Sequence, residues 1–328
     1  MRVLAAVSLL TMALVVAAPL TAQQATPEPT GSADGQAQIA ALAIPLYERA
    51  GAALQSREYE RAMLDFSLFI LLNPTSGQAY FGRALSHLGQ NDLDGALVDL
   101  EQALAVAPDE LAFRASVHRL RASLLASAGR EEQALDDYTQ ALELAPEGDI
   151  YVDRALLYLR TRMFSLALAD LDRALELLPE DADLYNYRAF AYAALARDAD
   201  AARDYQRFLQ ATAGAPVEGD ALAPGEFVVL QFEQGVVYSL PFEGRAGQVL
   251  NAVALARPET EVDPLLVLLD PDGEPISAND DRGGGVDAGI GGLRLPVDGT
   301  YMLLVGHSLG GAQGEVGVAI EFEDAGDS

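Results

Sequence analysis

The stretch AYFGRALSHLGQNDLDGALVDLEQALAVAP, residues 79–108, decides the fold of this 328-residue chain. It carries Arg83-Ala84, then Ala96 thirteen residues after the arginine, Asp99 sixteen residues after it, and a closing Pro108. Apolar residues recur at helical spacing on both sides of a central polar segment, which predicts two antiparallel helices. The small alanines let two helices approach closely, and the proline ends the second helix because it has no N–H to continue the ladder.

The same pattern occurs five times in the chain. Arg-Ala recurs at 49–50, 83–84, 121–122, 154–155 and 188–189, at intervals of 34, 38, 33 and 34 residues. The hairpin turn of each unit should lie midway between its arginine and its aspartate, near Arg57, Asn91, Gly129, Arg162 and Ala196. Each arginine and aspartate is then about 12 Å from the turn along antiparallel axes, so the two side chains should lie level with each other.

We call these Arg–Asp pairs the clips, and we expect at least three of the five to be ion-paired, within a unit or to the neighbouring unit. They are Arg49 with Asp65, Arg83 with Asp99, Arg121 with Asp137, Arg154 with Asp170, and Arg188 with Asp204. The competing interpretation is an arginine ladder that binds an anion. A built-in carboxylate partner favours the structural role.

The period, the alanines, the tyrosines that open first helices (Tyr80, Tyr151, Tyr185) and the closing prolines resemble tetratricopeptide repeats over about residues 43–213. The expected repeats are 43–76, 77–110, 115–147, 148–181 and 182–213, within a helical region 41–213. The third unit departs by about four extra residues around DELAFRAS, and the last unit lacks the proline.

The resemblance implies a right-handed α-solenoid whose first helices line a groove for a peptide or a partner protein. The candidate groove residues lie close to the clip arginines: Tyr47, Phe81, Leu85, Val152, Leu156, Asn186 and Phe190. Packing between neighbouring units is an equally open interpretation of these side chains. A lysine-based clamp for C-terminal carboxylates, which some family members use, cannot exist in this chain because it has no lysine.

The C-terminal part has the pattern of short strands. Runs such as FVVLQF (227–232), VVYSLPF (236–242), LLVLLD (265–270) and VGVAIEF (316–322) are separated by turn signals such as PDGEP (271–275). This predicts seven or eight antiparallel strands in a jelly-roll-like β-sandwich over 224–323, after a linker at 214–223 and before a tail at 324–328. The order of the runs is similar to bacterial pre-peptidase C-terminal domains. In some relatives such domains bind calcium or extracellular polymers, but no peptidase precedes this one.

Two motifs in this part suggest chemistry. Asp263, Asp280 and Asp281 offer oxygen ligands for calcium, the one cofactor that the resemblance leaves open, although a turn and a strand end explain them more simply. The segment Gly306-His307-Ser308-Leu309-Gly310 matches the G-x-S-x-G nucleophile elbow of hydrolases. No histidine follows Ser308, and a strand instead of a helix is expected after it, so we interpret the motif as a hairpin loop.

Charge and the N-terminal segment limit the partners and the compartment. The formal net charge is -28, which disfavours nucleic acid as a partner. Residues 1–22 have the layout of a secretory signal peptide, with an uncleaved membrane anchor as the alternative, and 23–40 should be a flexible leader. The chain has no cysteine, which excludes disulfides and a lipid-anchored lipoprotein. We expect an exported protein, periplasmic, cell-surface or secreted, with no membrane span after removal of the signal.

The sequence therefore predicts a multidomain α plus all-β chain that acts as an exported, non-enzymatic scaffold for proteins or peptides. The alternative is an adhesion or polymer-binding protein that acts through the β-sandwich, with or without calcium. A serine hydrolase is the third hypothesis, and the residue order after Ser308 argues against it.

Overall fold

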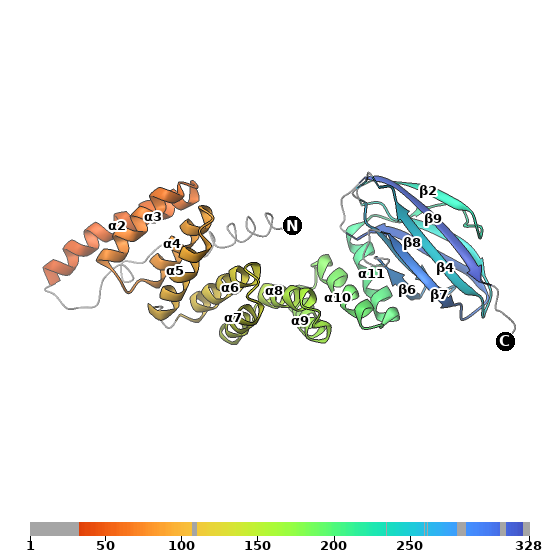
Figure 1. Ribbon diagram of the computed structural model, residues 1–328, viewed down its shortest axis with the longest axis horizontal. Coiled ribbons are helices and arrows are strands. Elements are labelled where there is room, and N and C mark those ends of the chain that lie inside the picture. Colours follow the sequence, from red (N-terminus) through yellow and green to blue (C-terminus); the bar gives the residue numbers. More distant parts are fainter. Residues whose placement is uncertain are drawn as a thin grey trace. The chain divides into compact units, whose positions relative to one another are not determined.

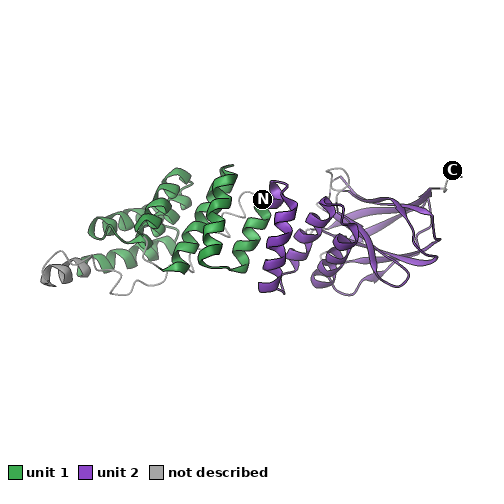
Figure 2. Cartoon of the chain, turned by 90° about the horizontal axis from the view of Figure 1, so that it is seen from below, with its two compact units in different colours: residues 1–157 green, residues 158–328 purple. Residues whose placement is uncertain are grey.

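The computed structural model describes residues 33–106, 110–233, 235–258, 260, 262–280, 287–308 and 313–323, with side chains from residue 41 onward. Within these residues ten helices are followed by nine strands. Figure 1 shows the helical part before the strands along the chain. The chain forms two compact units, residues 1–157 and 158–328, coloured in Figure 2 and described separately below. The expected signal peptide (1–22) and tail (324–328) lie outside the described residues. None of the described helices has the length and apolarity that a membrane span requires.

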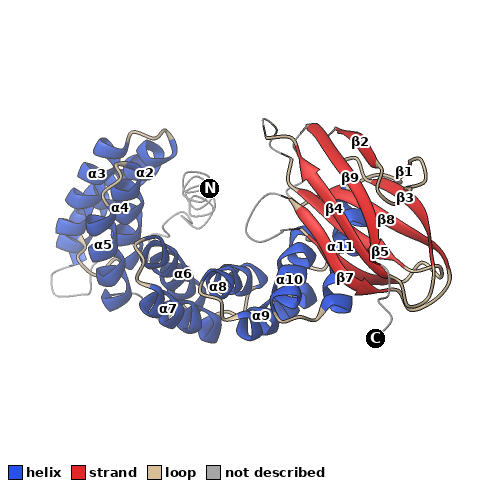
Figure 3. Ribbon diagram, turned by 45° about the vertical axis from the view of Figure 1, so that its right-hand side comes forward, coloured by secondary structure: helices blue, strands red, loops and turns tan. Residues whose placement is uncertain are grey.

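The first unit consists of stacked helix pairs. Its helices are α2 (Ala33–Gln55), α3 (Tyr59–Leu72), α4 (Gly77–Gly89), α5 (Leu93–Val106), α6 (Leu111–Ser127), α7 (Glu131–Leu144) and most of α8 (Gly148–Arg160). In Figure 3 the first helices α2, α4 and α6 lie along one side of this unit, and the second helices α3, α5 and α7 lie along the other. Because α2 begins at Ala33, the leader expected to reach residue 40 is wrong at its C-terminal end. Good helix formers such as Ala and Gln in AQIAALA extend the helix toward the N-terminus.

The hairpin turns lie at the positions that the repeat spacing predicts. The backbone has positive φ at Arg57 (59°), Asn91 (60°), Gly129 (74°), Arg162 (60°) and Ala196 (54°). A single left-handed residue ends the first helix and lets the next backbone N–H return to a helix carbonyl, as Glu58 N does to Ala53 O at 2.8 Å. Only one of the five is glycine, so four turns hold a side chain in a region that costs about 1 kcal/mol or more.

The ten alanines of the motif lie in the core of their helix pairs. Each has no exposed surface: Ala50, Ala62, Ala84, Ala96, Ala122, Ala134, Ala155, Ala167, Ala189 and Ala201. A larger side chain at these positions would hold the two helix axes apart. The invariant small residue is therefore a packing requirement of each helix pair.

The second unit combines helices with a β-sandwich. Helices α9 (Phe164–Leu177), α10 (Ala182–Ala194) and α11 (Asp198–Thr212) precede two sheets. One sheet has the order β1 (Val217–Glu218), β3 (Tyr238–Gly244), β8 (Gly299–His307), β5 (Pro264–Leu269), β6 (Pro275–Asn279), and the other has β2 (Phe227–Phe232), β9 (Gly314–Glu323), β4 (Val249–Ala256), β7 (Ala288–Arg294). All neighbours are antiparallel except β1 and β3. The predicted fold class, helical repeats followed by antiparallel strands, is confirmed.

Helix α11 covers the outer face of the sheet that contains β5, β6 and β8. Tyr205, Phe208 and Leu209 of this helix share a buried apolar cluster with strand residues such as Leu265 and Val267. The alternate residues of β5 point into the sandwich instead, so this strand is buried on both faces. The segment 214–223, expected as a linker, contains β1 and the buried Leu222. The last repeat and the sandwich are therefore joined by a common core.

Candidate partner-binding site

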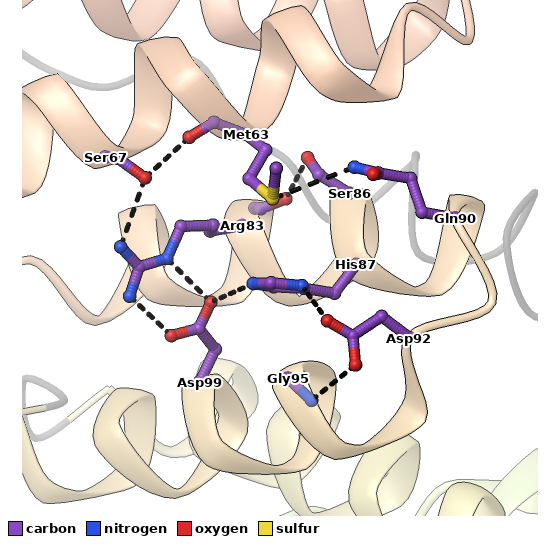
Figure 4. Close-up of polar contacts among 10 residues, drawn as sticks. Met63, Ser67, Arg83, Ser86, His87, Gln90, Asp92, Gly95 and Asp99 are labelled. Atoms are coloured by element: carbon purple, nitrogen blue, oxygen red, sulfur yellow. Dashed lines mark hydrogen bonds and ion pairs between the residues drawn. The ribbon is translucent and has the colours of Figure 1, made fainter.

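The clips form in the structure with two hydrogen bonds each. In Figure 4, Arg83 donates from Nε to Asp99 Oδ2 at 2.8 Å and from Nη2 to Asp99 Oδ1 at 2.7 Å. The pairs Arg49–Asp65, Arg121–Asp137 and Arg188–Asp204 have the same two-bond arrangement. Four of the five expected pairs are thus ion-paired. The remaining expected pair, Arg154 with Asp170, is divided between the two compact units and stays a prediction.

Three of the clip arginines also donate a hydrogen bond to the preceding helix pair. The Nη1 atom of Arg83 donates to Ser67 Oγ at 3.2 Å, that of Arg154 to Thr139 Oγ1 at 3.0 Å, and that of Arg188 to Asp172 Oδ1 at 2.8 Å. All three acceptors lie two residues after the clip aspartate of the preceding unit. Glu101 occupies the same position and interacts electrostatically with Arg121. These contacts therefore link neighbouring helix pairs, and they already use the Nη1 atoms of Arg83, Arg154 and Arg188.

Histidines reinforce two of the clip carboxylates. His118 Nδ1 lies 2.8 Å from Asp137 Oδ1, and His87 lies between Asp92 and Asp99, with Nε2 3.6 Å from Asp99 Oδ2. Burial alone would raise the pKa of Asp137, but the hydrogen bonds from Arg121 and His118 outweigh it and hold this pKa below its usual value. Both histidines of the repeats are therefore parts of the clips. Within the described residues no group of three or more His, Cys, Asp or Glu side chains is arranged to hold a metal ion.

We define the inner row as the side chains two residues before and two residues after each clip arginine, which include the candidate groove residues. Phe81 and Leu85 of α4 are only 4% and 1% exposed, so their prediction as groove residues is wrong. Both belong to one buried apolar cluster, in which the longer helix α6 brings Phe113 against Phe81 with ring centroids 5.8 Å apart. Tyr47 packs its ring against Phe66 at 5.7 Å, and burial raises its pKa to about 12.

The part of the inner row on helices α6 and α8, in the same unit, has different side chains. Arg119, two residues before Arg121, donates from Nε to Asp153 Oδ2 at 2.6 Å. Beside this pair on α8, Val152 is half-buried and Leu156 is 37% exposed. Burial raises the pKa of Asp153 in spite of Arg119, so this carboxylate is held in a poorly solvated place. Arg119 is not among the predicted groove residues, although it lies at the same offset from its clip arginine as Phe81 and Val152.

The inner-row residues of the second unit have local partners. Asn186 of α10 donates from Nδ2 to the carbonyl oxygen of Ser308 at 2.9 Å, so it holds α10 to the sandwich and is not a groove residue. Phe190 is 39% exposed and lies edge-on to Phe164, with ring centroids 6.2 Å apart.

The G-x-S-x-G segment serves the same junction. A Cβ atom on Gly306 would lie 2.4 Å from Leu209 Cδ2, so glycine at the end of β8 lets α11 lie against the sheet. Ser308 is 5% exposed and donates its hydroxyl to Asp263 Oδ2 at 2.5 Å, and His307 Nδ1 faces the Asp263 carbonyl at 3.1 Å. The hydroxyl is bound to a carboxylate instead of a histidine, which agrees with a loop. Leu309 and Gly310 lie outside the described residues.

Of the three candidate calcium ligands, the structure describes two. Asp263 Oδ1 is buried and has no hydrogen-bond partner within the described part of the chain, and Asp280 is half-buried at the end of β6. Asp281 lies outside the described residues. Calcium binding stays a prediction.

Comparison with known proteins agrees with the helical part of this description. Residues 117–147 match the family model of the tetratricopeptide repeat. Human tetratricopeptide repeat protein 13 is 29% identical over 148 residues, which cover 43% of this chain and 17% of that protein. Serine/threonine-protein phosphatase T of Trypanosoma brucei brucei is 37% identical over 94 residues, covering 29% and 19%. Human serine/threonine-protein phosphatase 5 is 42% identical over 76 residues, covering 23% and 15%.

The matched parts span less than a fifth of the length of these curated relatives. Among solved structures, MamA superposes with a TM-score of 0.48 at 12% identity, covering 52% of this chain and 91% of that one. YrrB, described as a tetratricopeptide-repeat protein with an unusual peptide-binding site, superposes with a TM-score of 0.46 at 19% identity, covering 52% and 86%. The family match therefore covers the third helix pair, residues 117–147. The likeness of residues 224–323 to pre-peptidase C-terminal domains stays a prediction.

Proposed function

We propose that this chain is a non-enzymatic scaffold that binds a segment of a partner protein through the inner row of helices α6 and α8. The observation that carries the proposal is the placement of the exposed Leu156 beside the Arg119–Asp153 pair on neighbouring first helices. An apolar contact next to oriented charges provides both affinity and register for a bound segment.

The rest of the repeat surface favours binding over catalysis. Four of the clip arginines donate two hydrogen bonds to their own aspartates, and Arg83 and Arg188 also donate to the preceding helix pair, which supports a structural role. The hydroxyl of Ser308 donates to Asp263 and its carbonyl accepts from Asn186, which supports a structural role for the serine motif. We further propose that the scaffold works outside the cytoplasm, on the basis of the signal-like pattern in residues 1–22.

A photo-crosslinking amino acid at Leu156 tests the proposed surface. The full chain is needed, because removing the strands would expose the apolar side of α11. In cell-envelope extract we expect one predominant adduct from position 156. The matched control is the same amino acid at Leu64, a 58% exposed leucine on the second helix α3, which should give no such adduct. Equal adducts from both positions, or none from position 156, would contradict the proposal.

The second candidate function, polymer binding by the β-sandwich, rests on the outer face of the four-stranded sheet. Phe227 and Val229 of β2 are 57% and 60% exposed, and Val229 lies in one row with Gly317 and the exposed Leu255. This flat apolar row is the kind of surface that binds a ligand. Co-sedimentation with isolated cell wall or with collagen, with calcium or a chelator present, should show binding that Phe227→Ser/Val229→Ser removes. Unchanged sedimentation of this variant would reject the β-sheet face as the binding site.

A further inference from the structure

We propose that a cavity between helices α5, α6 and α7 binds the basic side chain, arginine or lysine, of a partner segment. This site lies apart from the inner row of α6 and α8 and adds a second contact to the proposed scaffold. Its evidence is the shape and charge of the cavity itself, so it can be tested without knowledge of the inner-row ligand.

The cavity lies between the second and third helix pairs, which are separated by the longest interval of the repeat. The spacing between Arg83 and Arg121 is 38 residues instead of the 33 or 34 seen elsewhere, and α6 has 17 residues where α4 and α8 have 13. At this junction an open volume of about 510 Å³ remains between the helices. Volumes of this size are typical of ligand sites.

The wall of the cavity is acidic. Asp94 and Glu101 lie on one face of α5, and Asp136 faces them from α7. Arg121 also lines the cavity, but both oxygens of Asp137 already bind its guanidinium group. With Arg130 included, four carboxylates and two guanidinium groups line the cavity, a net charge of -2. An anion would therefore be repelled, and a cation attracted.

Three apolar side chains also line the cavity and form what we call its floor. Leu97, Val98 and Leu125 line it, and Val98 is 59% exposed between the carboxylates of Asp94 and Glu101. The exposed Val98, which lies between two carboxylates, can contact an aliphatic chain. Arginine and lysine combine such a chain with a cationic end, whereas an inorganic cation would gain nothing from this floor. The net charge of -28 further favours a basic partner by attracting it from a distance.

Fluorescence anisotropy with the full chain tests the proposal. The probe is a fluorescein-labelled nine-residue peptide that carries two arginines, compared with the same peptide carrying two glutamates. We expect the arginine peptide to bind at least tenfold more tightly. Replacement of cavity carboxylates in Glu101→Gln/Asp136→Asn should weaken its binding at least tenfold. Val98→Arg, which places a cation in the cavity, should do the same.

The control must separate this site from general attraction to an acidic chain. Glu143→Gln/Glu147→Gln changes the net charge by the same amount at exposed positions outside the residues that line the cavity, and should alter binding less than twofold. Equal weakening by the two double variants, or unchanged binding by Val98→Arg with a native circular dichroism spectrum, would overturn the proposal. The crosslink from position 156 should persist in the cavity variants, so failure here leaves the inner-row function separately testable.

Discussion

Replacing Leu209 by alanine should destabilise the helices and the sandwich of the second unit together. Leu209 is 4% exposed and lies between α11 and the sheet, against Gly306. Truncation of a buried leucine to alanine costs about 2–5 kcal/mol, the spread reflecting how far the site can collapse. Leu209 lies over Gly306, which has no side chain of its own, so we expect Leu209→Ala to lower the free energy of unfolding by about 3 kcal/mol. In a unit of this size 1 kcal/mol shifts Tm by about 2–4 °C, which predicts a loss of about 6–12 °C.

Differential scanning calorimetry of the full chain measures the shift, and hydrogen exchange with mass spectrometry locates it. Leu209→Ala should lower protection in α11 (Asp198–Thr212) and in β5, β6 and β8 to a similar degree, because these elements share one apolar cluster. Leu166→Ala is the matched control. This residue of the same unit is 50% exposed, and its truncation should cost less than about 1 kcal/mol. Loss of protection in α11 with unchanged strands would refute a common core.

Three further substitutions test the repeat itself. Asp137→Asn should lower the free energy of unfolding by about 1–3 kcal/mol at neutral pH, because it removes a charged partner of Arg121 and His118. The pKa of Asp137 is lowered in the folded state, so its stabilisation exists above about pH 4 and is lost as the pH falls through that lower pKa. The urea midpoints of variant and wild type should therefore converge in acid, and a constant difference would contradict this reasoning. Ala196→Gly should raise stability by up to about 1 kcal/mol, because it relieves a positive φ, and a lower Tm would disprove strain at this turn. Gly51→Ala should also stabilise by up to about 1 kcal/mol, because apart from the adjoining backbone of its own helix no atom lies within 4 Å of the new methyl group. A loss of stability would show a close neighbour there.

The periodic features of this fold could be predicted from the sequence. The clip Arg83–Asp99 and the turn at Asn91 follow from spacing alone, because a helix pair with a short turn fixes which residues lie level. The same offset, applied to every unit, would also have given Arg119. Because the same spacing occurs in every unit, a prediction made for one unit can be tested against the others.

The features that depend on contacts between elements could not be predicted in this way. Phe81 and Leu85 look like groove residues by position, but both are buried in one apolar cluster, in which Phe113 of the longer α6 packs against Phe81. The burial of both faces of β5 has a signal in the unbroken apolar run LLVLL, which is typical of a strand covered on two sides. Nothing in the sequence identified α11 as the element that covers it.

Hydrogen exchange on the full chain, with and without the partner crosslinked at position 156, tests the proposed function most directly. We predict new protection from exchange in α6 (Leu111–Ser127) and in the α8 segment 148–157, the two helices of the proposed binding surface, with little change in β2 and β9. New protection confined to β2 and β9 would contradict the proposed function, because the partner would then lie on the four-stranded sheet of the sandwich.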